Sequence, residues 1–261
     1  MIAIRRRSLA ALWRVQRYED YHDLVFEEAL APYAAEAKPN ELGTLLAIGA
    51  GWREAQALTR WPFDRIVLSG VAEPDAAIEE VIARDPRVAY ELANGEALPY
   101  ESRSFDVVLC KEALHHLARP VLGLYEMLRV CRRRAVLIEP WSCGWLALFD
   151  ALGLTTRIER GQVGNLAARD NHVYRLGRRE LAALLTSYYL ESGARCEVRV
   201  GWLSTRVLIP RAAALRRALV TAGWAASRLP GAAGNLATIA ITPGRDLPPD
   251  PLPLFATRKS G

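Results

Sequence analysis

The feature that most constrains the fold is a regular alternation of short apolar runs with helical segments in the first half of the chain. Five runs have the length and composition of buried strands: 44–48, 65–71, 88–92, 105–110 and 135–139. Strands that alternate with helices are typical of a parallel sheet covered on both faces, and near-continuous apolar runs fit that burial. In such sheets, ligands bind beyond the carboxyl ends of the strands.

The segments on either side of this core complete the predicted architecture. Residues 8–38 are predicted to form a helical cap, and 140–177 is long enough to be a lid insertion after strand five. Further elements are expected at 178–190, 196–203, 211–228 and 235–242. We therefore predict an α/β fold with a doubly wound, mostly parallel seven-stranded sheet in a single domain, 1–243. A flexible Pro-rich tail is expected at 244–261.

Composition narrows the setting and the partners. The chain of 261 residues is 51% hydrophobic and 24% charged, as in ordinary globular proteins. Its net charge of +5 comes from 34 basic and 29 acidic residues spread along the chain, so we expect no nucleic-acid partner. No apolar run is long enough to span a membrane, although the basic cap leaves peripheral contact open. The four cysteines match neither a zinc site nor a disulfide framework, which favours a cytoplasmic location and no metal.

The arginine run at the N-terminus has one competing interpretation. Arg5-Arg6-Arg7 is superficially similar to a twin-arginine export signal. Charged residues interrupt the following stretch from Arg14 onward, and no small-residue cleavage site follows. We therefore interpret the segment as part of the folded protein.

A glycine turn and an acidic residue suggest a nucleoside site. Gly49 and Gly51 end the first strand and open a helix, where backbone can approach a ligand closely. Glu73 follows the second strand and is suited to accept both hydroxyls of a ribose. Glu54 stands where dinucleotide enzymes have their third glycine, which leaves a nucleotide-binding oxidoreductase as the weaker interpretation.

The most specific motifs lie between residues 93 and 140. They are the stretch from Ala93 to Tyr100, which ends in Leu98-Pro99-Tyr100, the run Phe105-Asp106-Val107-Val108, the sequence Leu114-His115-His116-Leu117, and Glu126 to Val130. This series resembles the class I S-adenosylmethionine (SAM)-dependent methyltransferases, in particular the ubiquinone/menaquinone-methyltransferase-like branch. The resemblance implies a SAM cofactor and a small-molecule, glycan or lipid-like methyl acceptor.

The resemblance also implies roles for individual residues. Gly49 and Gly51 would face the methionine and ribose, Glu73 would hold the ribose, and Asn94 and Gly95 would meet the adenine. Cys110 and Lys111 would border the methionine part of the cofactor. His115 and His116 would lie near the acceptor, as candidate bases for transfer to oxygen or nitrogen.

Residues outside the motifs are further candidates for the acceptor site. From the expected lid, Asn171, His172 and Tyr174 are candidates, and Trp141 and Trp145 have the character of pocket walls. From the helical cap, Tyr18, Tyr21 and His22 are expected to be able to reach the mouth of the acceptor site.

Several positions depart from the family pattern. Ala47 stands where an acid usually precedes the first glycine, Arg53 replaces a third glycine, and Asn94 replaces an aspartate. Losing one charged hydrogen bond to the cofactor weakens binding by roughly 1.5–3 kcal/mol. The alternative function is therefore a methyltransferase-like binding or scaffold protein without turnover.

Overall fold

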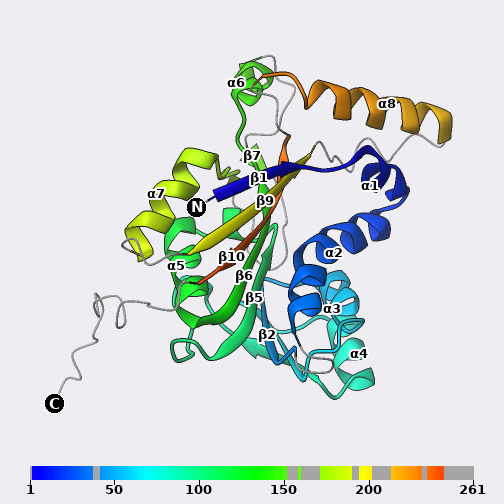
Figure 1. The fold of residues 1–261 in the computed structure, drawn as a ribbon. Coiled ribbons are helices and arrows are strands. Elements are labelled where there is room, and N and C mark those ends of the chain that lie inside the picture. The colour runs from blue at the N-terminus through cyan, green and yellow to red at the C-terminus, as the bar shows by residue number, and fades with distance from the viewer. Residues whose placement is uncertain are drawn as a thin grey trace.

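The computed structural model describes residues 2–37, 42–151, 158–159, 171–189, 194–201, 213–230 and 234–243. At its centre is an eight-stranded sheet with the order β1-β9-β10-β6-β5-β2-β3-β4 (Figure 1). The strands are β1 (Ile2–Arg6), β2 (Thr44–Ile48), β3 (Arg65–Gly70), β4 (Val88–Leu92), β5 (Phe105–Lys111), β6 (Cys131–Pro140), β9 (Arg195–Gly201) and β10 (Leu236–Thr242). A separate pair is formed by β7 (Ile158–Glu159) and β8 (Asn171–His172).

The strand order creates a crevice beside β2. This strand pairs in parallel with β3 on one side and with β5 on the other. After β2 the chain adds β3 and β4 on one side of it and then returns to add β5 on the other side. Strand β10 alone among the eight runs antiparallel to its neighbours. The carboxyl ends of β2 and β5 therefore meet at the point where the strand order reverses, which is where ligands bind in open α/β sheets.

Helices cover both faces of the sheet, as Figure 1 shows. On one face lie α2 (Tyr18–Glu36), α3 (Trp52–Leu58) and α4 (Ala76–Arg84). On the other lie α5 (Pro120–Val130) and α7 (Arg178–Tyr189). The remaining helices are α1 (Leu9–Arg14), η1 (Leu114–His116), α6 (Gly144–Ala151) and α8 (Ala213–Ala226).

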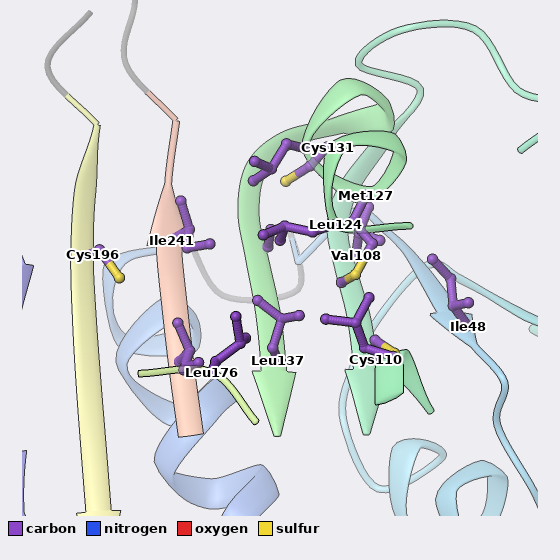
Figure 2. Close-up of a cluster of buried hydrophobic side chains, with 14 of the residues drawn as sticks. Ile48, Val108, Cys110, Leu124, Met127, Cys131, Leu137, Leu176, Cys196 and Ile241 are labelled. Atoms are coloured by element: carbon purple, nitrogen blue, oxygen red, sulfur yellow. The ribbon is translucent and has the colours of Figure 1, made fainter. Parts of the chain in front are cut away.

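Two apolar clusters fill the space between these helices and the sheet. Alternation along β2 sends Leu46 and Ile48 into one cluster and Leu45 and Ala47 into the other. Figure 2 shows the first cluster, in which strand residues such as Val108 group with helix residues such as Leu124 and Met127. A sheet apolar on both faces explains why the strand sequences are near-continuous hydrophobic runs.

The predicted count of seven strands was wrong, because Ile2–Arg6 forms an eighth. Strand β1 pairs in parallel with β9 along its whole length, with Ile2 opposite Cys196. It lies at the edge of the sheet, and four of its five residues are exposed. An edge strand buries little apolar surface, so its hydrophobic pattern is weak. The arginines at the end of β1 weaken that pattern further, which is why the strand was not predicted.

The outer segments agree with the prediction where they are described. The predicted helical cap consists of two helices, α1 and α2. Within the expected lid, 140–177, residues 152–157 and 160–170 lie outside the described ranges, and the lid itself stays a prediction. The tail, 244–261, also lies outside them, and the single-domain boundary stays a prediction. None of the described helices is both long and apolar enough to cross a membrane.

Candidate active site

The glycine turn after β2 has a conformation that requires glycine. Gly49 has a φ of +65°, and a Cβ atom added to it would lie 2.6 Å from the Cβ of Ala113. Its N–H donates to the carbonyl of Ser69 at 2.8 Å, which fixes the turn against β3. Gly51 then begins α3, and its N–H donates to Oε2 of Glu54 at 3.1 Å. The turn lies at the carboxyl end of β2, in the crevice.

Lys111 ends β5 as a buried cation beside this turn. Its side chain is only 2% exposed, and its ammonium donates to Glu54 Oε1 at 3.1 Å and to Glu112 Oε2 at 2.6 Å. The ring of Tyr21 from α2 lies 5.2 Å from the ammonium. Two carboxylates and an aromatic face thus offset the desolvation of the charge. The cluster ties α2, α3 and β5 together at the crevice.

His22 joins the same cluster from the helical cap. Its side chain is 3% exposed, and its Nδ1 lies 3.5 Å from Glu54 Oε1. Burial, together with the nearby positive charge of Lys111, lowers the pKa of His22 to about 4. The imidazole is therefore neutral near pH 7. Tyr21 and His22 are thus buried beside Lys111, and their position at the mouth of an acceptor site stays a prediction. The side chain of Tyr18 lies outside the described residues.

The residues expected to hold the nucleoside follow β3 and β4. Glu73 is exposed, just beyond the end of β3. Asn94 is also exposed, and its Oδ1 accepts the N–H of Glu96 at 3.0 Å. Gly95 is buried, and an added Cβ would lie 3.2 Å from Cγ2 of Ile48, so this turn packs against the end of β2. All three therefore border the edge of the sheet that carries the glycine turn.

A second polar pair lies on the opposite face of the sheet, under η1. The Nδ1 of His115 lies 2.5 Å from Oε2 of Glu139, and both side chains are almost fully buried. Oε1 of Glu139 accepts the N–H groups of Ala113 and Leu114 at 3.0 and 2.8 Å. A carboxylate can only accept, so in a pair of carboxylate and neutral imidazole Nδ1 of His115 donates to Oε2 and the lone pair is on Nε2. His116 lies against it, with ring centroids 4.2 Å apart.

Cys110 and Lys111 point to opposite faces of β5. The thiol of Cys110 is fully buried in the cluster drawn in Figure 2, and its Sγ lies 3.9 Å from Glu139 Oε1. Burial, with the Glu139 charge next in importance, raises its pKa well above the usual range. The thiol is therefore protonated. Because the side chain is buried in the cluster, Cys110 could border the methionine part of the cofactor only through its backbone.

The residues expected at the acceptor site from the lid lie in different surroundings, and their contact with an acceptor stays a prediction. Strand β8, which consists of Asn171 and His172, contacts η1, where His115 and His116 lie. The side chains of β8 are outside the description. Tyr174 is half-buried against the first apolar cluster, the one that α5 and α7 cover, and burial raises its pKa. Trp141 is buried in that cluster, and the indole N–H of Trp145 donates to the carbonyl of Pro230 at 2.7 Å.

Two acids in this region were not predicted as site residues from the sequence. Glu54 stands three residues after Gly51, a capping-box spacing that carries a recognisable signal. Glu139 ends an apolar strand, and a charge at that position in a buried sheet is itself a signal. Its partner, His115, is far enough away in the chain that only the fold reveals the pair.

Comparison with known proteins places this geometry in context. Residues 47–138, less than half of the chain, match the family described as a methyltransferase domain. The 27-O-demethylrifamycin SV methyltransferase of Amycolatopsis mediterranei is 31% identical over 157 residues, which are 55% of this chain and 54% of the relative. The chain thus spans about half the length of this curated relative.

Solved structures agree on the fold. A SAM-dependent methyltransferase from Methanosarcina mazei matches with a TM-score of 0.54 and 15% identity, over 84% of this chain and 100% of the other. The magnesium protoporphyrin IX methyltransferase of Synechocystis, solved with bound SAH, matches with a TM-score of 0.51 and 13% identity, over 85% and 83%. The chain has the Rossmann-like fold of class I SAM-dependent methyltransferases, and the ubiquinone/menaquinone-like branch stays a prediction.

Proposed function

We propose that this protein is an enzyme that transfers a methyl group from SAM to an oxygen or nitrogen atom of a small-molecule acceptor. The observation that carries the proposal is the buried His115–Glu139 pair, which lies beside the switch point of a methyltransferase fold. A general base needs a fixed tautomer and orientation, and the contact with Glu139 supplies both.

The residues at the glycine turn fit the charges and groups of SAM. Gly49 keeps the backbone open to a ligand, and exposed Glu73 offers two acceptors to a ribose. Asn94 has an amide group for the adenine edge, and Lys111 and Glu54 offer one charge of each sign to the methionine end. The cofactor supplies an electrophilic methyl group, and the protein holds the acceptor in line with it.

His115 would take the acceptor's proton at Nε2. In the neutral tautomer that donates from Nδ1 to Glu139, the basic lone pair is on Nε2, and the carboxylate would stabilise the imidazolium that forms. The neighbouring His116 is the second candidate, because it is less buried and its ring lies tilted against that of His115. Both remain proposals for the catalytic base.

The acceptor is proposed to be a small molecule that enters between η1 and the segment around β8. The named activity of the relative, on a demethylrifamycin, supports a small-molecule hydroxyl as the class of acceptor. Asn171, His172 and Tyr174 are the proposed acceptor contacts, within a proposed lid at 140–177. A cytoplasmic location and the absence of a nucleic-acid partner also remain proposals.

A binding protein without turnover is the second candidate. Glu54 already accepts hydrogen bonds from Lys111 and Gly51. Ala47 is buried and has no carboxylate, although the family pattern usually has an acid at this position. If Glu54 keeps its bonds to Lys111 and Gly51 when a ligand binds, the methionine end of SAM would lack a charged partner.

Calorimetric titration with SAM and S-adenosylhomocysteine tests the cofactor site. Saturable binding that Glu73→Ala weakens at least tenfold, and that the neighbouring surface variant Glu79→Ala leaves unchanged, would support it. Transfer of a labelled methyl group to a panel of hydroxyl and amine acceptors then separates the enzyme from the binding protein. Absence of binding to either ligand at millimolar concentration would refute both.

A further inference from the structure

An arginine-rich, partly open cavity lies at the β1 edge of the sheet. It has a volume of about 430 Å³ and is lined by residues of β1, β9, α1 and α2 and of the turn after β1. Five arginines line it: Arg5, Arg6, Arg7, Arg14 and Arg199. Its strand walls, β1 and β9, are five and four positions from β2 in the order of the sheet. Its helix wall is α2 from Leu24 onward, the helix that also carries Tyr21 and His22. The residues that line the cavity include none of those placed at the glycine turn or around Lys111.

Two of the five arginines are neutralised by acids of α2. Arg7 is fully buried and donates to Glu28 at 2.9 and 3.1 Å, with further bonds to the carbonyl of Leu236 and to Thr238. Arg14 pairs with Glu27 at 3.0 Å on the surface. These are the two acids among the residues that line the cavity. Arg7 thus forms a fixed floor, and its charge is satisfied.

The other three arginines have no acid to match them. For Arg5, Arg6 and Arg199, the structure gives no ion pair with a carboxylate in the described ranges. Arg5 and Arg199 are direct partners in the parallel β1–β9 pair, so their side chains leave the same face of the sheet. Arg5 also shares its face with Arg7, two residues on, which reaches toward α2. Like charges placed directly opposite each other destabilise a sheet.

From this arrangement we propose that the cavity binds a phosphoryl group. Arg5 and Arg199 bring two unmatched guanidinium groups to the same face of the sheet beside the cavity, and Arg6 also contributes to its lining. The planar fork of arginine suits the oxygens of a phosphate. A bound dianion would attract both Arg5 and Arg199 and so offset the repulsion between their two charges. The chemistry is the same for a soluble phosphate ester and for the headgroup of an anionic lipid. The proposal goes beyond the methyl-transfer function and does not depend on it.

The first test is calorimetric titration of the full-length protein with inorganic pyrophosphate at low salt. Wild-type protein is expected to bind saturably, with affinity that falls as sodium chloride is raised. Arg199→Gln and Arg5→Gln are each expected to weaken binding at least tenfold. Arg195→Gln is the matched control, because Arg195 is exposed on the same face of β9 but does not line the cavity. Its affinity should stay within twofold of wild type.

Thermal unfolding separates a ligand role from a structural one. Without pyrophosphate, Arg199→Gln and Arg5→Gln should unfold at the same temperature as wild type or a higher one, because a like-charge pair is relieved. Pyrophosphate should raise the melting temperature of wild type and not that of either variant. A lower melting temperature in both variants, with the response to pyrophosphate intact, would overturn the proposal.

Vesicles distinguish the two sources of the phosphoryl group. Sedimentation with phosphatidylglycerol vesicles, but not phosphatidylcholine vesicles, that is lost in Arg199→Gln would support a lipid headgroup. Binding of pyrophosphate without sedimentation would support a soluble phosphate ester. If neither pyrophosphate nor anionic vesicles bind the wild-type protein, or if Arg195→Gln behaves like Arg199→Gln, the cavity is not a phosphoryl site.

Discussion

Glu139 holds His115 by Nδ1 while its other oxygen accepts two backbone N–H groups from the start of η1. A single buried carboxylate therefore orients both the imidazole and the short helix that carries it. Because the two residues come from different elements, β6 and η1, the pair forms only when the sheet is complete. This relationship makes the proposed base testable.

Glu139→Gln should reduce methyl transfer strongly while leaving cofactor binding intact. The amide cannot stabilise an imidazolium as a carboxylate does, so we expect kcat to fall roughly a hundredfold or more, in the range of general-base contributions. His115→Ala should cost a similar factor, and the double variant little more, because the two act as a unit. The measurement is labelled methyl transfer, with SAM affinity by calorimetry as the control. An unchanged kcat in both single variants would assign the pair a structural role.

The low pKa of His22 predicts a pH-dependent stability. Its pKa of about 4 in the folded protein lies below the ordinary value of 6.5, so between these values the unfolded chain binds the proton. Stability should therefore be fully present above about pH 6.5 and fall as the pH drops toward 4, by about 3 kcal/mol in total for this group. Urea unfolding from pH 4.5 to 7.5 measures the slope.

His22→Phe is the matched variant for this slope. Phenylalanine keeps an aromatic ring beside Tyr21 and Phe26 but does not titrate. We expect its stability to vary less with pH across that interval than that of wild type. If both proteins show the same slope, the titration belongs to other groups.

Lys111→Met should destabilise the protein because it leaves Glu54 and Glu112 without their shared cation. Breaking a buried pair by removing one partner costs about 3–5 kcal/mol, and the partial exposure of Glu112 favours the lower end. Adding Glu54→Gln should recover part of the loss. A double-mutant cycle by urea unfolding measures the coupling. Strictly additive losses would show that the two side chains do not interact.

The two glycines of the turn should tolerate alanine very differently. Gly49→Ala places a Cβ in left-handed backbone and 2.6 Å from Ala113, so we expect a loss of at least 1–2 kcal/mol, roughly the cost of the backbone conformation alone. Gly51 has extended backbone, and its nearest neighbour is the flexible end of Glu54, so Gly51→Ala should cost under about 1 kcal/mol. Thermal or urea unfolding of the two variants compares them directly. Equal losses would contradict this reading of the turn.

The sequence predicted the parallel core because its signals are local. Residues such as Leu45 to Ile48 are apolar on both faces, and Gly49 follows at once, so strand and turn are recognisable without the fold. Strand β1 was missed because an edge strand needs few apolar residues, and Arg5 and Arg6 obscured those present.

The polar partners of the site were less predictable because they depend on contacts between distant elements. Lys111 was expected at the cofactor, but its pairing with Glu54 from α3 requires the crevice to be formed. The same holds for His115 and Glu139. The sequence can suggest which residues border a site, but it cannot show which charges neutralise one another.

Strand β1 also has a consequence for how the protein behaves in concentrated solution. It is the outermost strand of the sheet, so the hydrogen-bonding groups on its free side are those that a second molecule would meet. Arg5 and Arg6 sit on that border with exposed positive charge. Two such borders repel each other, which discourages sheets from joining edge to edge. Removing the strand would uncover β9, whose alternating Cys196, Val198 and Val200 are a far better template for aggregation.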